Sequence, residues 1–458
     1  ILLTSAATGL LMGMGYLTQR LHGQEITQAL AQIIPAATLS LTVMMLADNF
    51  TYTLFNYGIV SSRGLWRLLY AAGFILLLGY SWWRGWKAAH TLRRPGDRLR
   101  RGASWLAIAL AALSGAALIY GVVSQRDYYS SLLEPYTMPA ARQPNILLIG
   151  GDGLSTDHLS VYGYERDTTP FLRQLAEESL LAKSHFTNAS STTASTTAIL
   201  TGREPIEVDV MRYPDILKGI DAYNHLPGIL KNYGYTNIQV GVNSYVDAHA
   251  VNLLSGFDSI NGEQLIASPM LNTLQRLLGD SQVPNFLWTL LQRASDRIKH
   301  IFFIQEMENP IEAVLDPKAR SSDQDRVDMI LSVLDQSTRP VFMIAHFMGT
   351  HGPEFSFEDQ VYSEGEMEDN PWEFDFYDDA ITSFDSHVER IYNSLQEQDM
   401  LEDTILVIYT DHGYRYRTHV RLPLIIHFPG AEFAGEFNHN SANMDIPATL
   451  LDYMGLPR

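Results

Sequence analysis

Two short segments of the sequence carry side chains that could hold a metal ion. Asp152 follows the apolar run 145–149, and Asp411 and His412 follow the apolar run 404–410. Carboxylate oxygens and imidazole nitrogens are ligands that proteins use for divalent transition metals. An aspartate after a strand is more often a turn or helix-capping residue, so the inference rests on the two segments together.

A third segment, residues 188–203, is rich in hydroxyl groups at its front and apolar at its back. This pattern predicts a helix that begins near Thr192 and ends at Gly202. Serine and threonine commonly cap helices, which is the simpler interpretation. The alternative is that a hydroxyl at the positive end of this helix meets an anionic phosphoryl group, which the helix end would stabilise.

The elements that must position these side chains alternate along the chain. Apolar runs at 145–149, 340–346 and 404–410 are typical of buried parallel strands, and helical patterns occur at 169–178 and 383–398. The alternation predicts the α/β class with a mostly parallel central sheet.

The carboxyl ends of the three predicted strands carry the candidate ligands. Asp152 follows the first strand, His351 the second and Asp411 the third. Because parallel strands end at one edge of a sheet, where α/β folds bind their ligands, we expect these side chains to lie close together.

Charge divides the chain into two different parts. Residues 1–125 hold ten basic and three acidic residues, a net charge of +7, whereas 126–458 hold 22 basic and 48 acidic residues, a net charge of −26. The acidic part repels phosphate backbones, so nucleic acid is not expected as a partner. The absence of cysteine excludes disulfides, thiolate metal ligands and a cysteine nucleophile.

Four apolar runs in the first part predict membrane spans, at 1–17, 29–47, 65–83 and 104–123. Each is close to the roughly 20 residues that cross a hydrocarbon core of about 30 Å. The loop between the last two runs is rich in arginine, and such loops stay cytoplasmic. The chain after residue 124 is therefore expected on the periplasmic or extracellular side.

These features predict three regions. Residues 1–123 form a transmembrane helical domain with four visible spans, and a fifth is expected in the full protein. Residues 124–143 form a linker, and residues 144–458 form a periplasmic or extracellular catalytic domain. The predicted location is the bacterial inner (cytoplasmic) membrane, as a multi-pass protein whose oligomeric state the sequence leaves open.

Seven short motifs in residues 144–458 follow one another in a characteristic order. They are the segment from Pro144 to Asp152, Tyr162-Gly-Tyr164, Thr169-Pro170, Leu200-Thr-Gly-Arg203, Thr350-His-Gly-Pro353, Thr410-Asp-His-Gly413 and Val420-Arg-Leu-Pro-Leu-Ile-Ile426. In this order they resemble the sulfatase branch of the alkaline phosphatase superfamily, which implies an α/β sandwich. With a multi-span membrane part in front, the chain is similar to the lipoteichoic acid synthases and the phosphoglycerol and phosphoethanolamine transferases.

The sequence departs from the sulfatase pattern at three places. Thr192 stands where a sulfatase has the cysteine or serine that becomes formylglycine, and Gly153 replaces the second aspartate of the metal-binding pair. Residues 241–244 read Gly-Val-Asn-Ser, without the lysine and histidine that bind sulfate. Formylglycine is therefore not expected, and the loss of the second aspartate suits one transition metal rather than calcium.

The resemblance implies a site for one metal ion. By analogy with the membrane phosphotransferases, Asp152, Thr192, Asp411 and His412 hold one zinc or manganese ion. The ion would lower the pKa of the Thr192 hydroxyl, which is otherwise a poor nucleophile at neutral pH. Thr193 is the alternative nucleophile, because a shift of one residue in this threonine-rich run is open.

The same resemblance assigns two further histidines to the substrate. His351 matches the family's His-x-Pro element, and it and His419 would hold the phosphate or protonate the leaving oxygen. The loop between Gly413 and Leu422 is shorter than is usual in the family, which bears on His419 in particular.

The function predicted from the sequence is that of a membrane-anchored phosphotransferase. It would move the headgroup of a membrane phospholipid donor, phosphoglycerol or phosphoethanolamine, to an envelope glycan or lipid acceptor through a phospho-threonine intermediate. One alternative is a sulfatase-like hydrolase of sulfate or phosphate esters. The other is a non-catalytic regulator that senses lipid or lipopolysaccharide.

An acidic run at 354–379 holds eleven Asp or Glu and no Lys or Arg. We interpret it as a solvated loop. A calcium-binding or partner-contacting loop is the alternative, and nothing in the sequence selects it.

Overall fold

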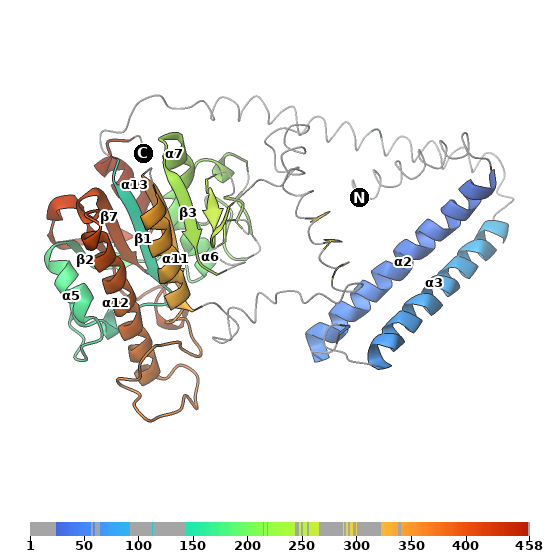
Figure 1. The fold of residues 1–458 in the computed structure, drawn as a ribbon, viewed down its shortest axis with the longest axis horizontal. Helices are drawn as coiled ribbons and strands as arrows, with labels where there is room; N and C mark the ends of the chain where they lie inside the picture. The colour runs from blue at the N-terminus through green and yellow to red at the C-terminus, as the bar shows by residue number, and fades with distance from the viewer. Residues whose placement is uncertain are drawn as a thin grey trace. The chain divides into compact units, whose positions relative to one another are not determined.

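The computed structural model describes residues 24–55, 58–59, 65–91, 143–264 and 322–456, except 214, 218, 243–246, 249–250, 254–255 and 338–339, with isolated residues at 112, 287, 290–291, 294–295 and 299. These residues belong to two compact units. One contains helices α2 (Gln24–Phe55) and α3 (Leu65–Thr91), and the other contains the strands that the structure describes (Figure 1).

Helices α2 and α3 lie side by side (Figure 1). Polar contacts occur between and beside them. The hydroxyls of Ser40 and Ser81 lie 3.4 Å apart, and the amide of Ile59 donates a 2.8 Å hydrogen bond to Oδ1 of Asp48. Buried polar side chains thus lie on both helices, Ser40 and Asp48 on α2 and Ser81 on α3.

Two of the predicted membrane spans, 29–47 and 65–83, fall on these helices. No helix of the described residues is both long enough and apolar enough to cross a membrane. The structure therefore gives these two spans no support. The other predicted spans, 1–17 and 104–123, and the predicted linker lie outside the described residues, apart from Ala112 and Gln143.

The second unit is built on a sheet for which the described residues supply nine strands. In spatial order they are β5 (Glu263–Gln264), β4 (Ser259–Ile260), β3 (Thr236–Val240), β6 (Val341–Phe347), β1 (Asn145–Gly151), β7 (Thr404–Tyr409), β8 (Ile425–His427), β2 (Leu180–Phe186) and β9 (Gly435–Ala442). The central strands β3, β6, β1 and β7 are all parallel, whereas β8 is antiparallel to both of its neighbours. The predicted mostly parallel α/β sheet is confirmed.

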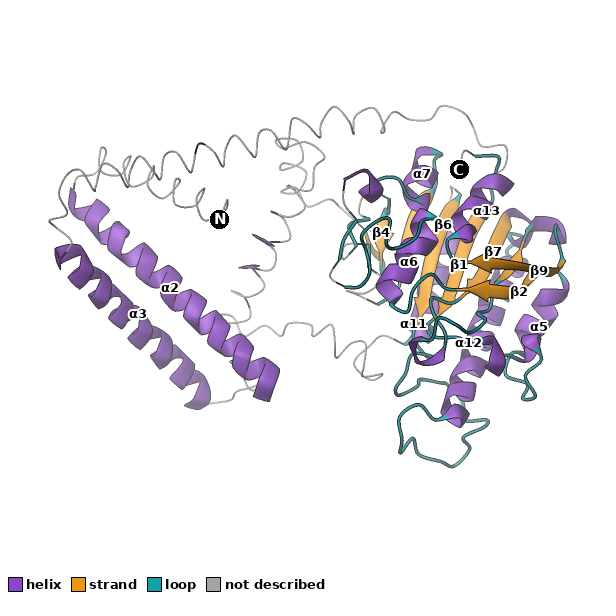
Figure 2. Cartoon of the chain, turned by 180° about the vertical axis from the view of Figure 1, so that it is seen from behind, coloured by secondary structure: helices purple, strands orange, loops and turns teal. Residues whose placement is uncertain are grey.

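Helices cover both faces of the sheet (Figures 1 and 2). Helices α5 (Pro170–Glu177), α11 (Asp323–Gln336) and α12 (Phe374–Glu397) lie on one face. Helices α6 (Thr192–Thr201), α7 (Leu226–Asn232) and α13 (Asp445–Tyr453) lie on the other.

Alternate residues of β1 enter two hydrophobic cores, one on each face of the sheet. Ile146 and Leu148 pack with α6, α7 and α13, whereas Leu147 and Ile149 pack with α5, α11 and α12. All four side chains are buried. Burial on both faces explains why the central strands are continuous apolar runs, and each such side chain contributes about 1.5–3 kcal/mol to stability.

A carboxylate of helix α12 caps the N-terminus of helix α5, on the same face of the sheet. Asp385 of α12 accepts hydrogen bonds of 2.8 Å from the amides of Phe171 and Leu172, in the first turn of α5. These amides need an outside partner, because a helix leaves its first N–H groups unpaired. Burial raises the pKa of Asp385 to about 7, against the lowering effect of the two amide hydrogen bonds.

Candidate metal and catalytic site

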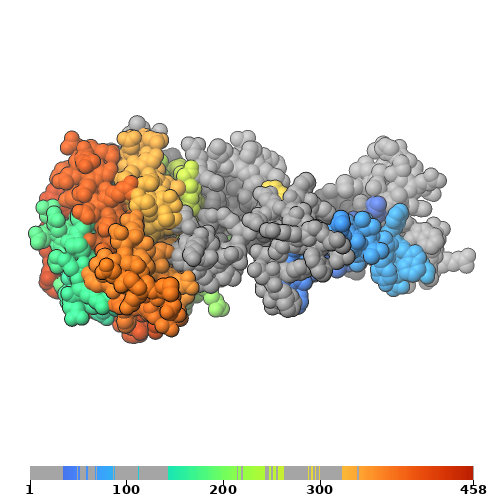
Figure 3. All heavy atoms as spheres, turned by 60° about the horizontal axis from the view of Figure 1, so that its bottom comes forward, coloured from blue at the N-terminus to red at the C-terminus, as the bar shows by residue number. Residues whose placement is uncertain are grey.

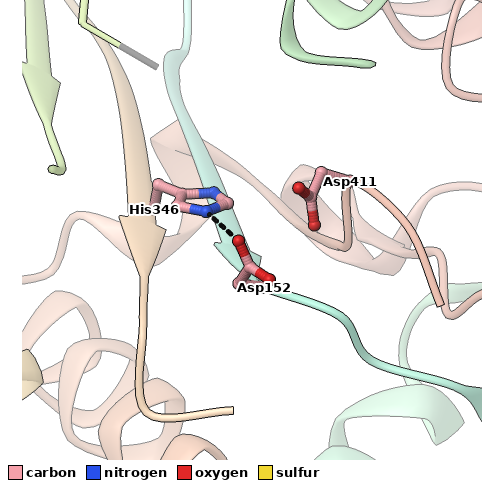
Figure 4. A group of neighbouring side chains, drawn as sticks. All are labelled: Asp152, His346 and Asp411. Atoms are coloured by element: carbon pink, nitrogen blue, oxygen red, sulfur yellow. Dashed lines mark hydrogen bonds and ion pairs between the residues drawn. The ribbon is translucent and has the colours of Figure 1, made fainter. Parts of the chain in front are cut away.

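Three neighbouring strands of the sheet end at one place. Strand β1 leads to Asp152, β7 leads to Asp411, and β6 carries His346 next to its last residue (Figure 4). The register pairs Gly150 of β1 with His346, so the strand ends coincide. Asp152, His346 and Asp411 are all buried, and one ligand atom from each lies within 4.8 Å of the others. The structure therefore brings the predicted residues Asp152 and Asp411 together, with a histidine beside them.

The two carboxylate oxygens of Asp152 face different partners. Oδ2 lies 3.0 Å from Nε2 of His346, whereas Oδ1 lies 3.7 Å from Nε2 of His412. The backbone carbonyl of Asp152 accepts a 2.6 Å hydrogen bond from the hydroxyl of Thr350. Asp152 is thus held by His346 and Thr350 and presents its other oxygen to His412.

Asp411 is arranged in the same way. Its Oδ1 accepts a 3.2 Å hydrogen bond from the amide of Gly153. Its Oδ2 makes no hydrogen bond within the described residues, and it lies 3.3 Å from Nε2 of His412. The backbone carbonyl of Asp411 accepts hydrogen bonds of 2.6 Å from the hydroxyls of Thr187 and Ser195. Each carboxylate therefore has one oxygen bonded to the protein and one turned toward His412.

Thr192 completes the group. It is the first residue of α6, and its Oγ1 lies 3.4 Å from Nε2 of His412. In a tetrahedral site with ligands about 2.0–2.2 Å from the metal, neighbouring ligand atoms are about 3.3–3.6 Å apart. The distances of 3.3, 3.4 and 3.7 Å from His412 to Asp411, Thr192 and Asp152 approach this spacing. The structure brings together all four residues that the sequence proposed as ligands.

This donor set fits a divalent metal ion. Three oxygens and one imidazole nitrogen suit several transition metals, among them the predicted zinc and manganese. Oδ2 of Asp411 is a buried carboxylate oxygen that makes no hydrogen bond within the described part of the chain. Burying a charge without a partner is costly, and a cation would relieve that cost. A divalent metal is supported here, and the choice between zinc and manganese stays a prediction.

The hydroxyl groups of α6 do not act as ordinary helix caps. Ser191 precedes the helix with an extended backbone, and its side chain makes no capping hydrogen bond. The hydroxyl of Thr197 bonds to the carbonyl of Thr193 within the helix, at 2.8 Å. Thr193 is buried, whereas the half-buried Thr192 faces His412. Of the two candidate nucleophiles, Thr192 is the one that lies beside the proposed ligands.

Neighbouring histidines favour the ionised form of Asp152. Burial raises its pKa, but the charges of His351 and His412 and the hydrogen bond from His346 outweigh burial and hold the pKa of Asp152 well below its usual range. For His346, burial lowers the pKa, and the hydrogen bond to Asp152 with the charge of Asp411 raises it above its ordinary value.

The structure separates the two histidines that the sequence assigned to the substrate. His351 is buried near Asp152, and its Nε2 lies 3.4 Å from the hydroxyl of Tyr416. His419 is exposed, and within the described residues no hydrogen bond or ion pair joins it to the four proposed ligands. His351 therefore adjoins the site, whereas a substrate role for His419 stays a prediction.

Sequence reasoning missed two residues of the site, His346 and Tyr416. His346 is the one polar side chain in the otherwise apolar strand β6, a signal that could have marked it. Tyr416 had no comparable signal. Its ring packs edge-on against His412 with the centroids 4.8 Å apart, a contact that depends on the turn that follows His412.

The backbone conformation at position 153 favours the glycine that stands there in place of the second metal-binding aspartate. Gly153 has a φ of +70°, in the left-handed region that glycine adopts without strain. A Cβ at this position would lie 3.6 Å from the ring of His412. An aspartate at 153 would therefore be strained by its backbone, although its Cβ would make only an ordinary contact with that histidine. Of the element at 241–244, only Gly241 and Val242 belong to the described residues.

The acidic run 354–379 is only partly a solvated loop. Asp378 and Asp379 are fully buried in the first turns of α12. Asp378 is bonded to His158 and Arg166, each at 2.7 Å, and Asp379 accepts hydrogen bonds from three consecutive backbone amides of the preceding loop. The loop prediction is wrong for these two residues, because they satisfy buried donors. Much of the rest of the run lies at the surface (Figure 3).

Several known proteins similar to this chain are named as sulfatases. An arylsulfatase of Hemicentrotus pulcherrimus is 22% identical over 353 residues, which cover 68% of this chain and 58% of that protein. Arylsulfatase A of Homo sapiens is 40% identical over 80 residues, which cover 18% of this chain and 15% of that protein. The matched part of this chain thus spans less than two thirds of the length of these relatives.

Solved structures also match part of the chain. A phosphonate monoester hydrolase of Agrobacterium radiobacter matches with a TM-score of 0.49 and 19% identity, over 69% of this chain and 74% of that one. The PsFucS1 sulfatase of Pseudoalteromonas matches with a TM-score of 0.46 and 20% identity, over 74% and 72%.

The family comparison covers all the strands that the structure describes. The family model described as Sulfatase matches residues 144–456, from the residue before β1 to the residues after α13. This match confirms the prediction of an enzyme of the sulfatase and alkaline phosphatase superfamily. By its sequence, the chain belongs to the sulfatase family.

Proposed function

We propose that residues 144–456 form a metal-dependent enzyme that cleaves phosphate esters with Thr192 as the nucleophile. The observation that carries the proposal is the position of the Thr192 hydroxyl, 3.4 Å from Nε2 of His412 and at the first residue of α6. A divalent ion held by Asp152, Thr192, Asp411 and His412 would lower the pKa of this hydroxyl and offset charge on the phosphoryl oxygens.

In the proposed reaction the Thr192 hydroxyl, whose pKa the bound ion would lower, gives its proton to water, and its oxygen attacks phosphorus. The bond between phosphorus and the leaving alcohol breaks, and the leaving oxygen takes a proton from His351, which is buried beside the site. The amides at the N-terminus of α6 favour the negative charge of the phosphoryl group. A hydroxyl from water or from an acceptor then gives its proton to His351 and attacks phosphorus. The bond between phosphorus and the Thr192 oxygen breaks, and this oxygen takes a proton from water.

The chemistry of threonine favours phosphorus over sulfur as the atom attacked. The usual sulfatase nucleophile is an aldehyde hydrate with two hydroxyls on one carbon. The β-carbon of Thr192 carries a methyl group and a single hydroxyl, so it cannot form this hydrate. A phospho-threonine needs no second hydroxyl, because attack on phosphorus by the acceptor releases it.

Hydrolysis of sulfate esters is the second candidate. The relatives that favour it are named arylsulfatase and N-acetylgalactosamine-6-sulfatase. Their names support a sulfuric ester hydrolase better than a transferase. Under this candidate, water is the acceptor and the ester is a sulfate.

For the phosphate ester we propose the headgroup of a membrane phospholipid, phosphoglycerol or phosphoethanolamine, which passes to an envelope glycan or lipid. The set Asp152, Thr192, Asp411 and His412, which by resemblance matches the metal ligands of the membrane phosphotransferases, supports this choice. Exposed apolar side chains also support it: Ile33, Leu39, Val43, Leu46 and Phe50 on α2, and Leu68, Ile75, Leu76, Tyr80, Trp82 and Trp83 on α3. The proposed location is the bacterial inner membrane, with the catalytic domain on its periplasmic or extracellular side.

Mass spectrometry of the peptide that contains Thr192 tests the proposal. The full chain, loaded with zinc or manganese, is incubated with a bacterial phospholipid extract and quenched in acid. We expect the mass of phosphoglycerol or phosphoethanolamine on Thr192, and no adduct in Thr192→Ala. The matched control is Thr193→Val, which alters the neighbouring buried residue and should keep the adduct.

Two other results would each decide against the main proposal. Release of sulfate from an aryl sulfate, with no phosphate adduct on the peptide, would favour the second candidate. An unmodified peptide in a protein that binds neither metal would overturn both enzymes and favour a regulator that only binds lipid.

A further inference from the structure

A tight turn lies directly beside the proposed ligands. It comprises residues 413–417 and is called the 413–417 turn below. The amide of Gly413 donates to the carbonyl of Arg417 at 2.9 Å, and the amide of Arg417 donates to the carbonyl of Gly413 at 3.2 Å. Because Gly413 follows His412 in the chain, these two hydrogen bonds fix the turn against the site.

The tip of the 413–417 turn has an unusual backbone. Arg415 and Tyr416 have φ values of 55° and 60°, in the left-handed region that residues with a Cβ seldom adopt. Such conformations persist where the surroundings require them, and they gather at binding sites. Here the conformation places the Tyr416 ring 4.8 Å from the His412 ring and its hydroxyl 3.4 Å from Nε2 of His351. The side chain is nevertheless 42% exposed, so it borders both the site and the solvent.

The same segment carries arginines that have no carboxylate partner in the described residues. The described residues of 143–264 and 322–456 include eleven Lys and Arg, and seven of these form ion pairs with Asp or Glu. The four others are Arg212, Arg415, Arg417 and Arg421, all exposed. Two of these four therefore belong to the 413–417 turn.

Aromatic rings hold Arg415 beside the site. Its Cζ lies 5.6 Å from the ring centroid of Trp372 and 5.3 Å from that of Tyr414. The Trp372 ring in turn lies 5.9 Å from the ring of Tyr416. A guanidinium stacked on rings keeps its charge and its N–H donors for another acceptor. Arg415, Trp372 and Tyr416 thus form one continuous surface that reaches His412.

A positive segment is exceptional in this part of the chain. Residues 126–458 carry 22 basic and 48 acidic residues, yet 412–431 contain three arginines and no Asp or Glu. An acidic surface repels anions, and a local group of arginines reverses this effect where it lies. The reversal is found in the segment that directly follows the proposed ligand His412 and that contacts it through Tyr416.

We propose that the 413–417 turn is an anion-binding subsite, an inference that rests on the proposed function of Thr192. Arg415 and Arg417 bind a second negatively charged group of the substrate. Tyr416 lies against the part of the substrate between that group and the phosphorus that Thr192 attacks. The substrate is then an ester with at least two anionic groups, such as a phosphorylated or carboxylated alcohol in ester linkage to phosphate.

A pair of aryl phosphodiesters tests the subsite on the metal-loaded full chain. One is the methyl phosphodiester of a phenol that bears a carboxylate, and the other bears a neutral carboxamide at the same position. The wild-type protein is expected to show a KM about tenfold lower for the carboxylate, with similar kcat values. R415Q/R417Q should lose this difference. Equal KM values in the wild-type protein, or an unchanged difference in the double variant, would overturn the subsite.

The matched control is R212Q. Arg212 is also exposed and has no ion pair within the described residues, but it follows the end of α6 that lies away from Thr192. We expect R212Q to keep the difference in KM. A loss of the difference in R212Q as large as in R415Q/R417Q would assign the effect to net charge and overturn the subsite.

A binding measurement separates failure of the subsite from failure of the proposed function. If no ester is turned over, the proposed function fails, and Thr192→Ala is titrated with 1,3-benzenedisulfonate and with benzenesulfonate. Tighter binding of the disulfonate by Thr192→Ala supports the subsite if it disappears in the variant that also carries R415Q and R417Q. Equal binding of the two anions by Thr192→Ala overturns the subsite. Phosphatidylglycerol vesicles and soluble glycerol 1-phosphate then compete with the disulfonate. Competition by the vesicles alone assigns the anion to a lipid, competition by both assigns it to the headgroup itself, and competition by neither counts against a phosphate anion at the turn.

Discussion

The hydroxyl of Ser195 donates a 2.6 Å hydrogen bond to the backbone carbonyl of Asp411, which joins helix α6 to the end of β7. Thr187 donates to the same carbonyl at 2.6 Å. Ser195 lies about one helical turn after Thr192. Its hydrogen bond to Asp411 therefore fixes the position of Thr192 relative to His412. The proposed nucleophile and the proposed ligands are therefore positioned by a contact that involves neither the metal nor the substrate.

Ser195→Ala should lower activity more than stability. The substitution removes the bond to Asp411 and the contacts of the Ser195 hydroxyl with Thr187 at 3.2 Å and with Asn443 at 3.1 Å, and each lost hydrogen bond costs about 1 kcal/mol. A small displacement of a reacting group can cost about a hundredfold in rate. We expect kcat to fall about a hundredfold, with a moderate decrease in Tm. The control is Thr197→Val, which removes a buried hydroxyl bonded only within α6, at 2.8 Å to the carbonyl of Thr193. Equal loss of kcat in both variants would mean that Ser195 has no special positioning role.

His346→Ala should weaken metal binding, because His346 bonds to Oδ2 of Asp152 at 3.0 Å and orients that carboxylate. Loss of a residue that orients a metal ligand typically costs about 10–100-fold in affinity. The dissociation constants for zinc and manganese are measured by competition with a chromogenic chelator. His346→Gln, whose amide can still donate to Asp152, should recover part of the affinity. Unchanged affinity in His346→Ala would show that Asp152 does not need this contact.

Asp411→Asn should have opposite effects on the metal-free and the metal-loaded protein. Without metal, the variant removes a buried charge at Asp411 Oδ2, which makes no hydrogen bond in the described part of the chain, so its Tm should rise. The wild-type protein should gain about 2.7 kcal/mol when the metal is present at a hundred times its dissociation constant, and the variant should gain little. Calorimetry before and after treatment with a chelator measures both. A wild-type Tm that does not respond to metal would contradict the proposed site.

Asp385 should make stability fall as pH rises toward neutrality. Burial raises the pKa of Asp385 to about 7 in the folded protein, above the unfolded value near 3.8. The folded state therefore binds the proton more tightly, and this contribution is present below pH 3.8 and lost as the pH rises through 7. Between pH 5 and 8 it amounts to about 3 kcal/mol. Chemical denaturation of wild type and Asp385→Asn at both pH values should show a smaller decrease in the variant, and parallel decreases would contradict the raised pKa.

The central sheet and part of the site were predictable from the sequence because local patterns carry them. The runs 145–149, 340–346 and 404–410 are apolar throughout, and they became β1, β6 and β7 in adjacent positions. The residues that follow parallel strands necessarily meet at one edge, which placed Asp152 and Asp411 together.

Other features depend on contacts that a local pattern does not encode. The bond between His346 and Asp152 requires β6 to be the neighbour of β1. The order of strands in a sheet cannot be predicted from the sequence of a single segment. The place of Tyr416 depends on two left-handed residues in succession. Asp378 and Asp379 stand in an acidic run that predicts solvent exposure, yet they are buried because distant donors bind them. Apolar content alone likewise predicted spans at 29–47 and 65–83 that the described helices do not support.

The order of the strands also governs when the site can exist during protein synthesis. Strand β1 pairs with β6 on one side and with β7 on the other. A nascent chain that has reached only α11 contains Asp152 and Thr192 but neither Asp411 nor His412. Those two residues must leave the ribosome, and β7 must pair with β1, before the Thr192 hydroxyl has its neighbours. The topology thus delays assembly of the proposed site until most of the sheet has been translated, so an incomplete chain lacks the neighbours that the proposal requires for Thr192.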